Sequence, residues 1–103
     1  MKRVIDTSEV LGTVEVPEGT CEVCASADAG YDETAGRLVV NLEAFLRTTN
    51  LRRKQERLKA DWLPKKETIT ESVQRDEGHQ LAEDVFHCWV RRVRQATPML
   101  HEH

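Results

Sequence analysis

The segment DEGHQLAEDVFHCWVRRVRQA, residues 76–96, has the most regular pattern in the chain. Its apolar residues come in neighbouring positions that recur every four residues, which places them along one side of an α-helix. These residues are Leu81, Ala82, Val85, Phe86, Trp89, Val90 and Val93. Asp76 and Glu77 place negative charge at the start, where the helix dipole favours it. We therefore predict an amphipathic helix over 76–96, ended by Pro98.

The segments before and after this helix have weaker patterns. Thr68-Ile69-Thr70-Glu71 fits a capping box at a helix start. The same Thr-Ile-Thr suits a β-strand, so residues 67–73 stay open between helix and strand. Residues 98–103 form a tail that we expect to fray.

A second helical pattern lies in the middle of the chain, between residues 42 and 62. Its apolar side chains fall at helical spacing: Leu42, Phe45, Leu46, Leu51, Leu58 and Trp62. Pro64 ends this segment, because a residue before proline is pushed out of the helical region. The pattern predicts one or two helices here, with Asn50 as the point where they divide.

The first forty residues alternate between apolar and polar positions. Thr13-Val14-Glu15-Val16 and Thr20-Cys21-Glu22-Val23-Cys24 flank Pro17-Glu18-Gly19, which predicts a hairpin. Residues 25–36 are small and polar, so we expect a loop. Arg37-Leu38-Val39-Val40-Asn41-Leu42 predicts a third strand beside the hairpin.

Together these patterns predict an α+β fold, in which a small N-terminal antiparallel sheet is followed by two or three packed helices. We expect a single domain over 1–103, with a β-rich acidic part in 1–42, a helical part in 43–97 and a frayed tail in 98–103. Residues 1–36 hold eight acids and two bases, whereas the remainder holds ten acids and thirteen bases. This asymmetry indicates charges that pair within the fold or two faces with different partners.

Composition narrows the class of protein. Apolar residues make up 39% of the 103 residues and charged residues 32%, which indicates a thin core or one that a partner completes. No stretch approaches the roughly 20 apolar residues that cross a bilayer. No apolar stretch of a secretory leader follows Met1-Lys2-Arg3. Three cysteines do not form a closed disulfide set, so we expect a soluble cytoplasmic protein with no membrane association.

Cys21-Glu22-Val23-Cys24 is the motif most suggestive of chemistry. Two thiolates on a hairpin can hold Zn²⁺, and His87 with Cys88 would have to complete the four ligands. A redox role needs a thioredoxin-like context that the sequence lacks. The simplest interpretation is that one cysteine faces inward and the other outward. No cofactor is assured, and zinc is the only one that the sequence suggests.

Two charged patterns lie on the predicted helices. His79, Glu83 and His87 are spaced four residues apart, and Asp84 and His87 form an acid-x-x-His pair. Either pattern can hold a metal, but the acid-x-x-His pair would need a second pair and further inward carboxylates, or a dimer that supplies them, so a solvated polar face is the simpler interpretation. The segment LRRKQERLK, residues 51–59, holds five bases, which can neutralise phosphates or form a salt-bridged face.

No phosphate loop, nucleophile elbow or zinc-protease motif is present in the sequence, which lowers the expectation of catalysis without excluding it. We therefore expect a non-enzymatic protein-interaction module or accessory subunit that can also self-associate. The expected contact residues are Trp62, Trp89, Arg52, Arg53, Lys54 and Arg57. The alternatives are a small zinc-binding protein and, third, a nucleic-acid-binding accessory protein that uses the basic segment.

Overall fold

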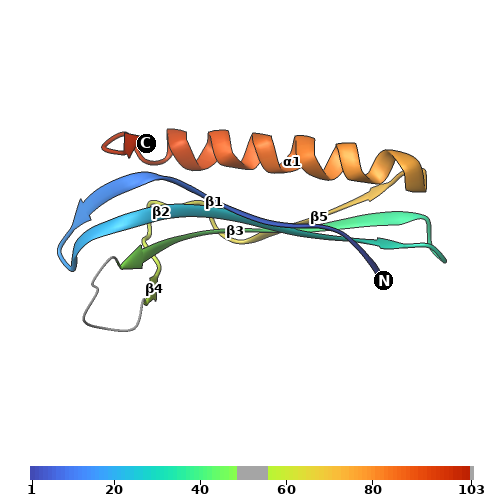
Figure 1. The fold of residues 1–103 in the computed structure, drawn as a ribbon, viewed down its shortest axis with the longest axis horizontal. Coiled ribbons are helices and arrows are strands. Elements are labelled where there is room, and N and C mark those ends of the chain that lie inside the picture. Colours follow the sequence, from blue (N-terminus) through green and yellow to red (C-terminus); the bar gives the residue numbers. More distant parts are fainter. Residues whose placement is uncertain (49–55, 103) are drawn as a thin grey trace.

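A computed structural model describes residues 1–48 and 56–102. Their backbone forms a long antiparallel sheet with a single helix lying across it (Figure 1). The strands are β1 (Lys2–Val16), β2 (Gly19–Asp32), β3 (Arg37–Thr48), β4 (Arg57–Leu58), β5 (Glu67–Ser72) and β6 (His101–Glu102), and the helix is α1 (Arg75–Gln95).

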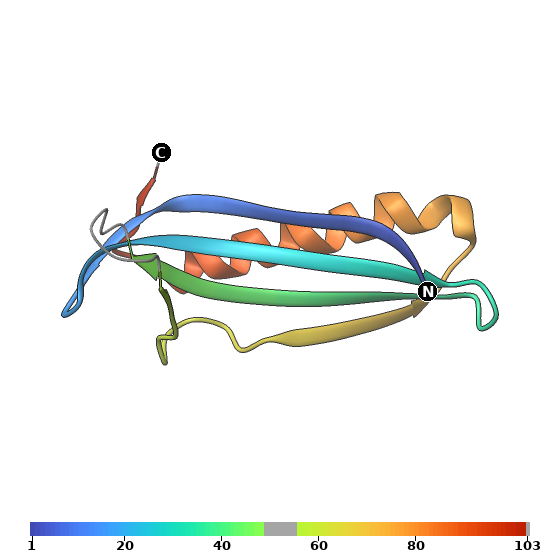
Figure 2. The ribbon, with the colours of Figure 1, turned by 60° about the horizontal axis from the view of Figure 1, so that its bottom comes forward.

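The sheet is built from neighbouring segments of the chain that fold back on one another. Its order is β4-β3-β2-β1-β6, and β5 pairs with β3 beyond β4 along the same edge (Figure 2). The β1–β2 hairpin closes with Val16 opposite Gly19. Asp32 lies opposite Arg37 at the turn into β3, where Gly36 has a φ of +64°, which glycine adopts without strain.

The core lies between α1 and one face of the sheet. α1 packs against β1, β2 and β3 and buries Ala82, Phe86, Trp89, Val90 and Val93. Beneath it, β2 presents the buried small side chains of Ala25, Ala27 and Ala29 at every second position. Small residues let the helix approach the backbone of the sheet closely, and large residues on the flanking strands fill the sides of the core.

Trp89 is the largest fully buried side chain, with 1% of its surface exposed. Its indole Nε1–H donates a hydrogen bond of 2.8 Å to the carbonyl oxygen of Glu43 in β3. The bond satisfies the polar atom of an otherwise apolar side chain, which a buried indole requires. This tryptophan therefore fixes the position of α1 over β3.

The predicted α+β fold with two or three packed helices is wrong, because the described residues form a sheet-dominated fold with one helix. The error lies in the segment after Leu42, where β3 continues to Thr48 instead of becoming helical. Leu38, Val40, Leu42 and Leu46 are all buried on the side facing α1, which is the two-residue period of a strand. Phe45 lies on the opposite face of the sheet. Its spacing from Leu42 and Leu46 is the feature that suggested a helix.

Three other segments also contain strands where the sequence predicted a loop, an open choice or a frayed tail. Residues 25–32 belong to β2 and not to a loop, because their alternating alanines are the floor under the helix. Residues 67–72 are a strand, which resolves the open choice there. The tail does not fray throughout, since β6 pairs with Gly12 and Thr13 of β1.

The remaining predicted elements are confirmed. The hairpin around Pro17 and the strand from Arg37 are present, and each is longer than predicted. The predicted helix over 76–96 matches α1, with Asp76 and Glu77 in its first turn and Arg92 and Arg94 in its last. Among the described residues, no helix is both long enough and apolar enough to span a bilayer.

Candidate interaction surface

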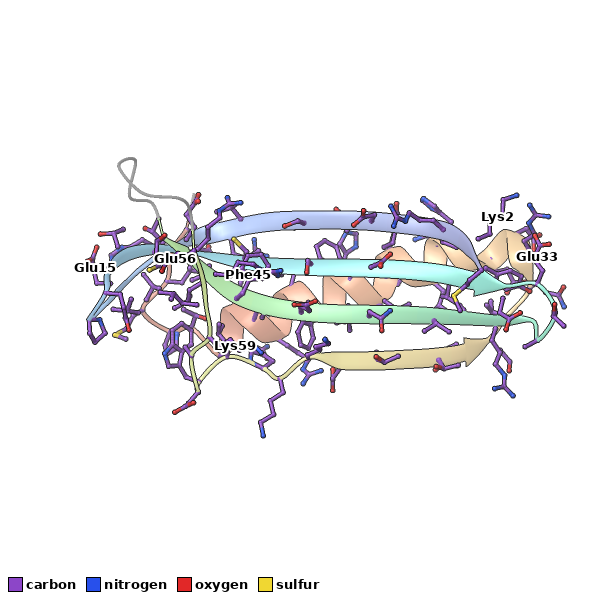
Figure 3. All side chains as sticks on the ribbon, turned by 90° about the horizontal axis from the view of Figure 1, so that it is seen from below. Lys2, Glu15, Glu33, Phe45, Glu56 and Lys59 are labelled. Atoms are coloured by element: carbon purple, nitrogen blue, oxygen red, sulfur yellow. The ribbon has the colours of Figure 1, made fainter. Side chains whose placement is uncertain are left out.

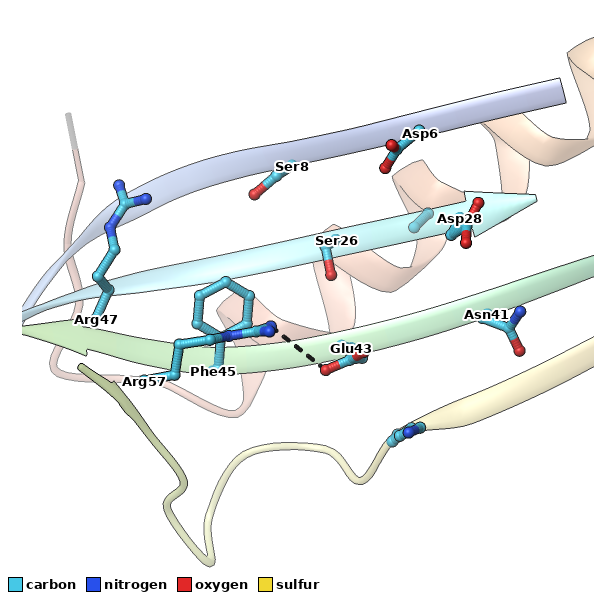
Figure 4. A pocket seen from close by; sticks show the side chains of 11 residues that line it. Asp6, Ser8, Ser26, Asp28, Asn41, Glu43, Phe45, Arg47 and Arg57 are labelled. Atoms are coloured by element: carbon cyan, nitrogen blue, oxygen red, sulfur yellow. Dashed lines mark hydrogen bonds and ion pairs between the residues drawn. The ribbon is translucent and has the colours of Figure 1, made fainter. Parts of the chain in front are cut away.

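The face of the sheet opposite α1 carries mostly polar side chains (Figure 3), and Arg57 of β4 lies over its Phe45. The register aligns them in rows across the strands: Asp6, Asp28 and Asn41 in one row, and Ser8, Ser26 and Glu43 in the next. Phe45 follows beside them, and the rows line a shallow hollow of about 680 Å³ (Figure 4). A polar open face is usual for an antiparallel sheet with one side in water.

Two arginines on this open face are paired with neighbouring carboxylates. Arg57 lies 3.7 Å from the centre of the Phe45 ring and contacts Glu43 at 3.4 Å. Arg47 contacts Glu22 at 3.0 Å. These cations are therefore already neutralised by neighbouring carboxylates, which weakens the open face as a site for phosphates.

The edge formed by β1 is irregular. Its register with β2 shifts between Arg3 and Ile5 and again between Val10 and Gly12. Bulges of this kind twist an edge and interrupt the row of backbone groups that another strand would need. At Gly12 and Thr13 the edge is covered by β6.

An ion-pair cluster connects β6, the C-terminal strand, with α1 and with this edge. The Arg94 Nε lies 2.9 Å from a carboxylate oxygen of Glu102, and its Nη2 lies 4.0 Å from one of Glu9. The cluster joins α1, β6 and β1. It therefore contributes to closing this edge of the sheet.

The opposite edge, formed by β5, is regular. Six consecutive residues of β5 pair with β3 without a register shift, from Glu67 opposite Leu42 to Ser72 opposite Arg37. No proline or lysine interrupts them, and within the described part of the chain β5 pairs only with β3. An edge strand of this kind presents free backbone N–H and C=O groups to a further strand.

β5 also lies beyond the strands on which α1 packs. Ile69, opposite the buried Val40, points to the helix side and remains half-buried. A groove of about 370 Å³ separates β5 from the helix, with the half-buried Leu81 and Val85 along its helical wall. Glu71 and Asp84 also line this groove. Arg92, which is paired with Glu67, lines the groove too, so the groove is apolar at its floor and carries charges of both signs at its margin.

The four predicted metal ligands do not converge. Cys21 points toward the core and Cys24 toward the open face, because residues three apart in a strand project to opposite sides. His87 and Cys88 are exposed on α1. Within the ranges that the structure describes, no three histidine, cysteine or acidic side chains are grouped to hold a metal ion. These four residues therefore do not form a zinc site in this structure.

Burial raises the pKa of both strand thiols above the ordinary value. For Cys21 the carboxylates of Glu18 and Glu15 raise the pKa further. For Cys24 burial is again the largest cause, and Arg47 partly opposes it. A raised pKa keeps a thiol protonated, which makes it a poor nucleophile and a poor metal ligand.

The predicted interface residues are dispersed. Trp89 is in the core, whereas Trp62 is 40% exposed in the segment before β5. Arg57 is paired with Glu43 on the open face. Arg52, Arg53 and Lys54 lie outside the described residues.

The polar pattern on α1 forms only a local contact. His79 Nε2 lies 3.6 Å from a carboxylate oxygen of Glu83, on the exposed side of the helix. His87 and Asp84 are exposed as well. This geometry matches the expected solvated face.

The most distinctive surface, the β5 edge with its groove, was not among the predicted site residues. The signal for it in the sequence is the Thr-Ile-Thr alternation in residues 68–70, which suits both a strand and a helix start. A single half-buried isoleucine between two glutamates is the pattern of an edge strand with one apolar contact. No protein-family model, curated protein or solved structure matches this chain.

Proposed function

We propose that the protein is a non-enzymatic interaction module that binds a partner polypeptide by accepting a strand at the β5 edge. The observation that carries this proposal is that, among the described residues, β5 is regular, lies outside the strands on which α1 packs closely and is unpaired on its outer side. In strand addition, backbone hydrogen bonds supply affinity, and alternate side chains reach pockets beside the edge.

The groove beside β5 supports the same proposal. A strand added to β5 would place every second side chain on the helix side, next to Ile69 and the helical wall. Aliphatic side chains would cover the half-buried Ile69, Leu81 and Val85. Basic side chains in the same row would face Glu71 and Asp84.

The experiment is site-specific photo-crosslinking in cells. A benzophenone amino acid is placed at Thr70 on β5, and in a matched variant at Ser8 on β1. Both positions are exposed hydroxyl residues on edge strands, so the two variants differ mainly in which edge carries the probe. We expect a discrete covalent adduct from position 70 and none from position 8.

The mass of the adduct identifies the partner as this chain or another protein. Equal adducts at both positions, or adducts at position 8 alone, would contradict the assignment of the interaction to β5. Circular dichroism of both variants verifies that each keeps the sheet and the helix.

A further inference from the structure

We propose that the strand received by β5 is the β5 of a second copy of this chain, so that one continuous sheet runs through a symmetric dimer. This inference rests on the proposed function, because it names the partner of the same edge. In such a dimer both outer edges of the long sheet are β1, with its bulges and its β6 cover. Association therefore closes at two copies, as expected for a twofold interface.

Side-chain alternation restricts how two β5 strands pair. A twofold axis perpendicular to the sheet pairs them antiparallel and keeps both helices on one side. Residues directly opposite each other in an antiparallel pair point to the same face. Ile69 lies opposite the buried Val40, so the odd-numbered residues of β5 face the helix side in each copy. Odd residues therefore pair with odd, and even with even.

Charge selects among the symmetric registers that remain. A pairing centred on Thr68 sets Lys65 opposite Glu71 of the second copy, and symmetry repeats this contact. A pairing centred on Ile69 instead sets Glu67 opposite Glu71 of the second copy. Like charges directly opposite each other destabilise a sheet, and opposite charges stabilise it.

The third register, centred on Thr70, sets Glu71 opposite Ile69 of the second copy and forms no ion pair. The register centred on Thr68 also extends the pairing onto Lys65 and Lys66, which are exposed in the isolated chain. In that register Ile69 lies opposite Glu67, whose carboxylate is already bridged by Arg92. We therefore assign the register centred on Thr68.

Disulfide trapping tests this register directly. Thr68→Cys is made in a Cys88→Ser background, which removes the exposed native thiol and leaves Cys21 and Cys24 buried. Opposite residues in antiparallel strands have Cα atoms about 4.5–5.5 Å apart, within the range of a disulfide. Thr70→Cys is the matched control, because its two copies would be offset by four residues, about 13 Å.

We expect Thr68→Cys to oxidise to a covalent dimer in nonreducing electrophoresis and Thr70→Cys to stay monomeric. Efficient trapping through Thr70→Cys, or equal trapping at both positions, would overturn the register.

A charge exchange provides the second test, with molar mass measured by light scattering at low salt. Lys65→Glu and Glu71→Lys should each raise the dissociation constant of the dimer roughly tenfold, and the double variant should restore it. Lys65 lies two residues before β5 and Glu71 lies within it, so the two are six positions apart, about 20 Å in extended chain, and restoration within one chain is excluded. Single variants that leave the molar mass unchanged would overturn the proposed contact.

The failure of the dimer is distinguishable from the failure of the edge. A chain that stays monomeric in both tests, yet forms a heavier adduct with another protein from position 70, overturns the dimer alone. A chain that gives no adduct at position 70 overturns the dimer and the strand-addition proposal together.

Discussion

The two edges of this sheet differ in how regular their edge strands are and in what covers them. β1 is interrupted by two register shifts and covered at Gly12 and Thr13 by β6. β5 pairs evenly along its length, and α1 contacts it through the Arg92–Glu67 ion pair and not through close backbone packing. Proteins commonly protect edge strands with bulges, charges or covering segments. β1 has bulges and a covering strand, whereas β5 has only the charges of Glu67 and Glu71, so a partner strand can pair with β5 without first displacing part of the fold.

Trp89→Ala gives the largest expected effect, because Trp89 is buried between α1 and the sheet and its indole binds the backbone of β3. Losing a side chain that is 1% exposed should reduce the free energy of unfolding by about 3–5 kcal/mol in urea titration. Trp62→Ala is the control, since its side chain is 40% exposed, and should cost less than about 1 kcal/mol. Equal losses would mean that Trp89 is not the anchor of α1 on β3.

Gly12→Ala tests the protected edge. A Cβ at Gly12 would overlap the backbone carbonyl of His101, so β6 must shift away from β1. We expect a loss of about 1–3 kcal/mol in the free energy of unfolding. An unchanged stability would show that β6 does not cover the β1 edge as described.

Gly78→Ala is the matched substitution away from both edges. Its Cβ would meet Leu38 at 3.7 Å and Tyr31 at 3.9 Å, which are ordinary contacts. Replacing a glycine inside a helix should raise stability by about 0.5–1 kcal/mol. Association should stay unchanged, since the substitution leaves β5 untouched. A loss of stability would indicate tighter packing of α1 on the sheet than these contacts show.

The smallest expected effect concerns the cysteines. Cys88 should be alkylated first at neutral pH, with Cys21 and Cys24 protected until the protein unfolds, as followed by intact mass. Protection should persist after treatment with a chelator, because burial causes it. Loss of protection on chelation would instead support a metal site.

The raised pKa values also set a direction for stability against pH. Both thiols remain protonated in the folded chain when the unfolded chain already ionises near its ordinary pKa of 9.0. Their contribution to folding is therefore present below that pH, and it is lost as the pH rises through the raised folded-state pKa. Urea titrations of the wild type and of Cys21→Ala across this range test the direction. A wild type that becomes relatively more stable there would contradict it.

The helix and the hairpin were predictable because their patterns are local. The dipole charges at Asp76 and the turn at Pro17 need no knowledge of the rest of the chain. The second half of β3 was not predictable in this way, because Phe45 imitates a helical period that only the burial of Leu46 on the other side corrects.

The loop predicted from residue 25 onward was wrong for a similar reason, since residues 25–32 belong to β2. Small residues usually indicate a loop, and the helix that requires Ala25, Ala27 and Ala29 lies far along the chain. The sequence also could not predict that β5 forms an open edge. Which strands lie under α1 depends on the position of Trp89 over β3, which is a tertiary contact. The Thr68-Ile69-Thr70 pattern suits a strand and a helix start alike, and it could not show that a strand there would be an edge.

The most direct test of the account is hydrogen exchange on the wild-type chain, compared between dilute and concentrated protein. If β5 receives the strand of a second copy, amide protection in peptides that cover residues 67–72 should rise with concentration. Peptides that cover residues 2–11 of β1 should exchange at the same rate in both samples. Protection that rises in β1, or that stays constant in β5, would contradict the assignment of β5 as the edge through which this chain associates.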